Sequence, residues 1–273
     1  MKKSLAALCA LLISGCASVP EPEAVTAWQA EELRLAGADE AVDSSQPLAA
    51  ALSAVDLRRV ANLKRARQDC LRLVLDHPDS PAVLWRASRA EADRVVLARS
   101  KGEPREVRDL AALSGLDYAR RAAERAPEDP AARAQLAYAL GTTTHLLPMG
   151  ARSERARDVL QAVDAALALD PEQPVALATQ ATLHLRLATL PWIATVFASD
   201  VPEADLALAE RAARHALRLQ DSHEHRLLLA KVLLARDAED EARSVLNVAG
   251  AGAPQPRDEE LRAEVEALRA ELD

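Results

Sequence analysis

Two histidines in one short segment are the first residues of this chain whose types could carry chemistry. His223 and His225 flank Glu224, and histidine and glutamate are common zinc ligands. Side chains two positions apart point about 200° from one another on a helix, so the two imidazoles cannot share a metal ion unless the segment is a turn. A helix cap with exposed polar residues explains the segment better. We therefore predict no metal site here.

A second candidate is Gly141-Thr142-Thr143-Thr144-His145, which sets hydroxyl groups beside a histidine. A hydroxyl nucleophile needs a base that a third group orients, and no positioned acid is identifiable in the sequence. Such a segment more often ends a helix as a loop. The sequence also lacks the glycine-rich loop that holds phosphates. These observations predict a protein that is not an enzyme and has no cofactor.

Composition indicates which elements must position any site. The 273 residues include only 8 glycines and 2% aromatic residues, against 49% hydrophobic residues. A β-sandwich, a β-barrel or a dinucleotide-binding fold needs glycine turns and β-branched strands, whereas the abundant Ala, Leu, Arg and Glu are strong helix formers. The fold class is therefore predicted to be all-α. The net charge of −8 argues against a nucleic-acid partner, which requires a basic surface.

The N-terminus has the order of features found in a secretory signal. Two lysines precede nine apolar residues, Leu5–Ile13, a run shorter than the about 20 residues that span a bilayer. The next residues, Ser14-Gly15-Cys16, complete a segment that resembles the lipobox of bacterial lipoproteins. That resemblance implies a diacylglyceryl group on the Cys16 thiol and cleavage before Cys16. An ordinary secretory signal with an incidental cysteine is the alternative.

These features divide the chain into three parts. We predict a lipoprotein signal peptide at residues 1–15, a lipidated tether with a short helix at residues 16–47, and a helical domain at residues 48–273. Ala17 rather than aspartate follows the lipidated cysteine, which predicts a periplasm-facing lipoprotein of the outer membrane. Cys70 lies in an apolar helical stretch and is expected to behave as a small buried hydrophobe.

The body of the chain repeats one kind of turn. Pro78, Pro127 and Pro171 are separated by 49 and 44 residues, and Asp221 follows 50 residues later. Such a period, with two helices in each unit, indicates a helical-repeat array. Proline begins a helix where its missing N–H costs nothing, and nearby Asp or Ser side chains are expected to cap it. We predict a right-handed array of about four units with a C-terminal capping helix.

These units resemble tetratricopeptide repeats. Small residues stand five positions before three of the turns: Ala122, Ala166 and Ala216. In that family, small residues at this position let the two helices of a unit approach closely. Leu73 takes this place in the first unit, which departs from the pattern. The period also exceeds the usual 34 or so residues of the family, which predicts longer helices or loops.

A narrower resemblance covers residues from about 82 to 270. It rests above all on Leu187-Ala188-Thr189-Leu190-Pro191-Trp192, and also on Trp85–Ala90, Ala165–Pro171, Glu224–Lys231 and the Glu259–Leu272 helix. In these segments the chain resembles the divergent repeat family shared by regulators of microtubule dynamics and the TatT lipoprotein of TRAP-type (tripartite ATP-independent periplasmic) transporters. The lipobox favours the bacterial lipoprotein branch. The resemblance implies a periplasmic protein partner, such as a TRAP solute-binding subunit.

The segment Leu190–Phe197 is expected either to fill the core or to form a binding surface. It contains one of three Trp residues and the only Phe, and Pro191 breaks helix continuity on its N-terminal side. Tryptophan is enriched at binding hot spots, and repeat arrays bind along an extended surface. We hypothesise that Pro191, Trp192 and Phe197 border a binding groove, with core packing as the alternative.

Three functional hypotheses follow from the sequence. The first is a membrane-anchored lipoprotein whose helical array binds another protein. The second is a binder of a small apolar ligand, in a groove or in the pore of an oligomer. The third is a structural component of envelope assembly. The lipid on Cys16 would provide the membrane contact in each case, and a homo-oligomer is compatible with all three.

Replacement of Cys16 by serine tests the anchor. The Cys16→Ser variant is expected to remain an uncleaved precursor without lipid, because it lacks the thiol that carries the diacylglyceryl group. Immunoblots of fractionated cells and mass spectrometry of the N-terminal peptide measure both effects. Stable anchoring needs at least two acyl chains. Normal maturation and retention of the variant in the outer membrane would show that the lipobox assignment is wrong.

Overall fold

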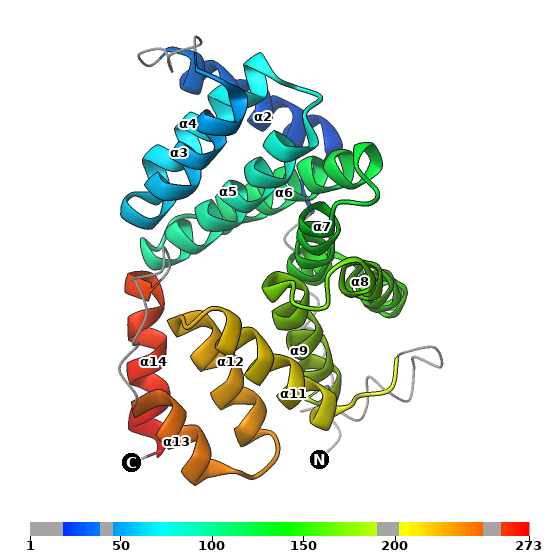
Figure 1. Ribbon diagram of the computed structural model, residues 1–273, viewed down its shortest axis with the longest axis vertical. Coiled ribbons are helices and arrows are strands. Elements are labelled where there is room, and N and C mark those ends of the chain that lie inside the picture. The colour runs from blue at the N-terminus through cyan, green and yellow to red at the C-terminus, as the bar shows by residue number, and fades with distance from the viewer. Residues whose placement is uncertain (1–18, 39–45, 190–201, 248–257, 273) are drawn as a thin grey trace, which may run out of the picture.

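The protein, seen here in a computed structural model, is an array of paired helices (Figure 1). The structure describes residues 19–38, 46–189, 202–247 and 258–272. Within these ranges every regular element is helical, as the composition predicts. The elements are α2 (Pro22–Ala38), α3 (Leu48–Ala61), α4 (Leu63–Asp76), α5 (Pro81–Ser100), α6 (Arg105–Arg125), α7 (Pro130–Thr143), the 3-10 turn η1 (Thr144–Leu146), α8 (Met149–Leu169), α9 (Pro174–Ala188), α11 (Leu206–Leu219), α12 (His223–Leu234), α13 (Glu239–Asn247) and α14 (Asp258–Leu272).

The helices pack mainly against their neighbours along the chain. Four units each join a first helix to a second: α5 to α6, α7 to α8, α9 to α11, and α12 to α13. The helix α14 packs on α12 and α13 at the C-terminal end, and α3 pairs with α4 at the N-terminal end. The predicted all-α array of paired helices with a C-terminal capping helix is thereby confirmed.

Proline and capping side chains determine where several helices begin. Pro81, Pro130 and Pro174 each occupy the first turn of a helix, where the missing N–H needs no partner. The Asp129 carboxylate accepts a hydrogen bond from the backbone N–H two residues further on, at 2.9 Å. The Ser222 hydroxyl caps α12 in the same way, at 3.2 Å. The repeated turns therefore stop one helix and start the next.

Alanine occupies the contacts between helices. Ala122, Ala166 and Ala216 are fully buried, at the positions that the sequence assigns to helix crossings. Ala166 of α8 packs in one cluster with Ala134 of α7 and Ala176 of α9. The buried apolar side chains of the array pack between neighbouring helices in this way. None of the helices in the described ranges is both long and apolar enough to cross a bilayer.

Helices outside the repeat pairs pack near both ends of the array. The helix α2 lies against α4 and α6. Gln29 in α2 donates a hydrogen bond to Asp117 in α6 at 3.2 Å, and Arg72 in α4 donates to the Ala36 carbonyl at 2.8 Å. At the other end, α14 also contacts α5, so the curved array brings its last helix back to its first full unit (Figure 1).

Overpacking at Ala166 tests this arrangement of units. The Ala166→Leu substitution is expected to lower the free energy of unfolding by about 1–3 kcal/mol, because the buried alanine cluster has no room for a larger side chain. Urea denaturation followed by circular dichroism measures the change. Arg157→Ala, on the exposed side of the same helix, should leave stability almost unaltered. Equal effects of the two substitutions would contradict the assigned helix contacts.

Candidate binding surface

A cluster of arginines and carboxylates joins α2, α3, α4 and α5. Arg59 of α3 donates to both carboxylate oxygens of Asp93 in α5, at 2.5 and 2.8 Å. Arg67 of α4 pairs with Glu91 of α5 at 2.7 Å and with Glu32 of α2 at 2.6 Å. Asp93 and Glu91 are almost entirely buried. A buried carboxylate without its cation is strongly unfavourable, so these pairs restrict how the four helices meet.

Trp85 lies half-buried beside this cluster. The guanidinium carbons of Arg86 and Arg89 are 4.1 and 5.0 Å from the centre of its ring, which is cation–π geometry. Both arginines also pair with Asp56 of α3. Burial alone raises the pKa of Asp56, but the hydrogen bonds and charges of Arg86 and Arg89 outweigh burial and lower that pKa. We call Asp56, Trp85, Arg86 and Arg89 the Trp85 platform.

The platform belongs to a stripe of partly exposed residues on the first helices of the units. Trp85, Arg89 and Ala92 follow one side of α5, at i, i+4 and i+7. Tyr138 of α7 and Thr182 of α9, both partly exposed, continue the stripe. Arg89, Tyr138 and Thr182 are separated by 49 and 44 residues, the same spacings as the turn prolines. These five residues therefore occupy one face of successive repeats, which we call the first-helix stripe.

Neighbouring first helices are also tied together by a polar contact. Arg186 of α9 donates a hydrogen bond to the carbonyl of Gly141 in α7, at 3.3 Å. The two helices pack directly on one another along their length. The first-helix stripe is therefore carried by helices with fixed relative positions, as a surface that recognises a folded partner requires.

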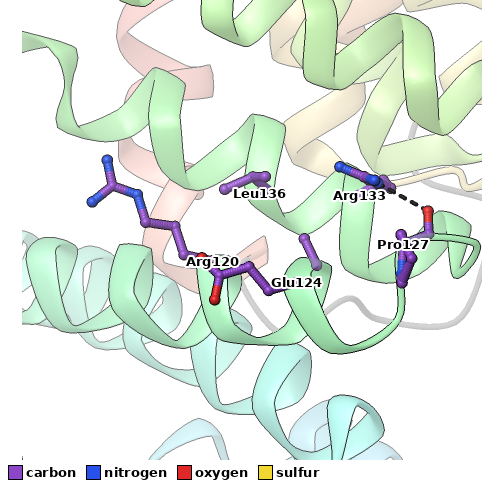
Figure 2. A pocket seen from close by; sticks show the side chains of 6 residues that line it. Arg120, Glu124, Pro127, Arg133 and Leu136 are labelled. Carbon is purple, nitrogen blue, oxygen red and sulfur yellow. Dashed lines mark hydrogen bonds between the residues drawn. The ribbon is translucent and has the colours of Figure 1, made fainter.

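A shallow pocket lies between α6 and α7 (Figure 2). It has a volume of about 300 Å³ and is lined by Arg120, Ala123, Glu124, Pro127, Arg133 and Leu136. Arg133 donates a hydrogen bond to the Pro127 carbonyl at 2.9 Å and so stabilises the turn. Figure 2 shows the guanidinium of Arg120 directed away from the carboxylate of Glu124. The pocket is open and carries three charged side chains, so it is a surface depression rather than an enclosed apolar cavity.

The threonine-histidine segment ends a helix, as predicted. The Nδ1 atom of His145 lies 2.9 Å from the Thr142 carbonyl, and its Nε2 atom lies 3.5 Å from the buried carboxylate of Asp109. This acid comes from α6 and is not recognisable from the sequence around His145. The hydroxyls of Thr142, Thr143 and Thr144 all donate to helix carbonyls, so the histidine activates none of them.

The segment His223–His225 begins α12 after the capping residue Ser222, as expected, but His225 is buried rather than exposed. The Nδ1 atom of His225 is 2.7 Å from the Gln220 carbonyl at the start of α12. In the part of the chain that the structure describes, no three His, Cys, Asp or Glu side chains are placed to hold a metal ion. Cys70 is buried as predicted, and burial raises the pKa of its thiol to about 12. This thiol is therefore protonated and unreactive at neutral pH.

Four predicted site residues lie outside the described ranges: Cys16, Pro191, Trp192 and Phe197. The lipid anchor and the groove at Leu190–Phe197 therefore stay predictions. No sequence motif assigns a binding role to the Trp85 platform. Trp85 stands within a segment that resembles the repeat family. Asp56, however, is 30 residues from Arg86 in the sequence, and only the tertiary fold brings the two side chains together.

Paired helices that repeat every 44–50 residues, with alanines at their crossings, define a helical-repeat protein of the tetratricopeptide type. The structure is similar to the crystal structure of TTC0263, a thermophilic TPR protein in Thermus thermophilus. That similarity has 17% sequence identity and a TM-score of 0.55, and covers 88% of this chain and 97% of that chain. At this identity the similarity concerns the fold. Arrays of this type are typically non-catalytic scaffolds that bind proteins.

The sequence also matches a family model, described as Regulator of microtubule dynamics protein 1-3, over residues 55–273. The match covers most of the chain, and the protein belongs to this family. It includes every helix from α4 to α14 and leaves out α2. No curated protein matches the sequence significantly.

Acid should weaken the Trp85 platform. Because the pKa of Asp56 is lowered in the folded protein, its ion pairs contribute stability above the unfolded pKa of about 3.9 and lose it as pH falls through the folded pKa. Asp56→Asn is expected to cost up to about 1 kcal/mol at neutral pH, since the carboxylate is partly exposed. The difference between wild type and variant should shrink below pH about 4. A difference independent of pH in urea denaturation would contradict this role.

Proposed function

We propose that the protein is a membrane-anchored, periplasm-facing lipoprotein whose helical repeats bind another protein. The observation that carries this proposal is the first-helix stripe. It is partly exposed, follows the repeat spacing across α5, α7 and α9, and has the Trp85 platform at one end. Tryptophan and arginine are enriched among the residues that contribute most to protein binding.

The chemistry of the stripe suits a protein surface. Trp85 offers an apolar ring, Arg89 offers guanidinium donors, and Ala92 leaves space for a side chain of the partner. The guanidinium of Arg89 is only partly exposed and is already oriented by Asp56, so little side-chain entropy is lost on binding. A partner with an apolar residue beside an acidic one would match this arrangement.

The predicted anchor would hold this surface close to the membrane. The helix α2 begins at Pro22, so five residues separate it from Cys16. An extended chain covers at most about 3.6 Å per residue, so α2 would lie within roughly 20 Å of the lipid. Because α2 packs on α4 and α6, this end of the array would be held near the membrane. A partner would therefore be recruited to the membrane surface.

The specific partner we propose is a TRAP-type solute-binding subunit. Its support is the resemblance of Leu187–Trp192 and the neighbouring segments to the TatT lipoprotein, together with the lipobox. An apolar small-molecule ligand has less support, because the pocket between α6 and α7 is open and charged. A role in envelope assembly would use the same stripe with a different protein partner.

Binding to a TRAP solute-binding protein encoded beside the gene tests the proposal. Ala92→Glu, at the stripe position next to Arg89 on α5, is expected to weaken binding at least about tenfold in calorimetry, because it places a charge against the partner's apolar surface. Ala165→Glu, at a partly exposed alanine of α8, is the matched control and should bind like wild type. Thermal melts should be similar for all three proteins.

The possible results separate the parts of the proposal. Failure of the wild type to bind would contradict the TRAP partner. Equal binding by wild type and Ala92→Glu would show that the stripe is not the binding surface.

A further inference from the structure

The helix α3 leaves an apolar face uncovered at the N-terminal end of the array. This face consists of Ala50, Ser53, Leu57, Val60 and Ala61, all exposed and all opposite the buried side of the helix. Leu57 is 74% exposed and Val60 is 48% exposed. Terminal helices of repeat arrays ordinarily need a polar outer face for solubility. We call these five residues the α3 face.

The last helix of the array, α14, has a different kind of outer face. Ala263, Ala267 and Ala270 are exposed at i, i+4 and i+7, opposite the buried Val265. Exposed glutamates stand on both sides of this alanine row, at positions 264, 266 and 271. We call the three alanines and these glutamates the α14 face.

The two faces are complementary in shape. Leu57 and Val60 project from α3, while the α14 face presents only methyl groups between its glutamates. Large side chains on one helix and small ones on the other allow the helix axes to approach closely. The helices also match in length, since 14 and 15 residues correspond to about 21 and 22 Å.

The two faces are complementary in charge as well. The side chains of Arg58 and Arg65, beside the α3 face, are 44% and 42% exposed, whereas Asp69, with which both pair, is 4% exposed. The exposed charge there is therefore positive, and Lys64 adds to it. Around the alanine row of α14, Glu264 pairs with Lys231 of α12. Glu266 and Glu271 are also exposed and outnumber the exposed Arg262, so the exposed charge there is negative.

We propose that the α3 face of one molecule binds the α14 face of a second copy, so that arrays associate end to end. This contact joins two different surfaces and leaves one of each free, so it generates rings or open chains rather than a closed two-fold dimer. One helix pair buries less than the about 1,200–2,000 Å² of stable complexes, so association is weak and depends on concentration. The proposal uses none of the residues of the first-helix stripe and does not depend on the proposed partner.

Sedimentation velocity of the lipid-free chain, residues 17–273, tests the contact over a wide range of concentrations. Wild type is expected to show a sedimentation coefficient that rises with concentration. Leu57→Glu and Ala267→Arg should each abolish the rise, because each removes one of the two faces. Both positions are exposed, so the melting temperatures should stay near that of wild type. Leu35→Glu, at an exposed leucine of α2, is the control and should associate like wild type.

A mixture of the two variants gives the sharpest result. Leu57→Glu keeps its α14 face and Ala267→Arg keeps its α3 face, so an equimolar mixture should form dimers and nothing larger. A wild type that stays monomeric at every concentration overturns the proposal. Association that survives either substitution also overturns it; for example, a contact between two α3 faces would be lost in Leu57→Glu but kept in Ala267→Arg. A mixture of the two variants that remains monomeric overturns it as well.

Discussion

Close approach of helices at alanine is the constraint on which the array depends. The chain has only 2% aromatic residues, so few large side chains are available to fill space between helices. Ala119, Ala122, Ala166, Ala213 and Ala216 are all fully buried. An alanine methyl group is short, so it contacts the next helix only when the two backbones lie close together. Dispersion attraction and burial of apolar surface stabilise the helix pair only at that short distance. The turns must therefore place each helix accurately, and the proline and capping residues at the turns do so.

Alanine side chains are identical and small, so two helices that meet through them could pack in more than one register with similar stability. The arginine–carboxylate pairs in the N-terminal region supply the missing specificity. Arg67 meets both Glu32 and Glu91, and Arg59 meets Asp93, so a shift of one helix along another would leave a buried charge unpaired. Buried ion pairs add little net stability, but breaking one costs several kcal/mol, about 3–5. We interpret the cluster as the device that aligns α2, α3, α4 and α5.

A neighbouring set of ion pairs holds the Trp85 platform in place. Asp56 pairs with Arg86 and Arg89, and these two arginines lie against Trp85, so an aromatic side chain is held at the surface by ion pairs. The Thr143 hydroxyl and the Nδ1 atoms of His145 and His225 lie within hydrogen-bonding distance of backbone carbonyls near helix ends. The remaining accessible features are surfaces: the first-helix stripe along the units and the two unlike faces at the ends. Such surfaces suit a protein that binds other proteins.

The features that the sequence by itself determined are local ones. Helix class, the turns at Pro78, Pro127 and Pro171, and the alanines before them depend on neighbouring residues, since capping and helical periodicity act within a few positions. The N-terminal signal is local too, and it stays a prediction. Only the tertiary structure decided which distant residues meet. Asp56 and Arg86, Asp109 and His145, and α5 and α14 are brought together by the tertiary fold. Whether Leu57 is covered or exposed depends on which helices lie beside α3. Side-chain pattern in one helix contains no information about neighbours that come from elsewhere in the chain.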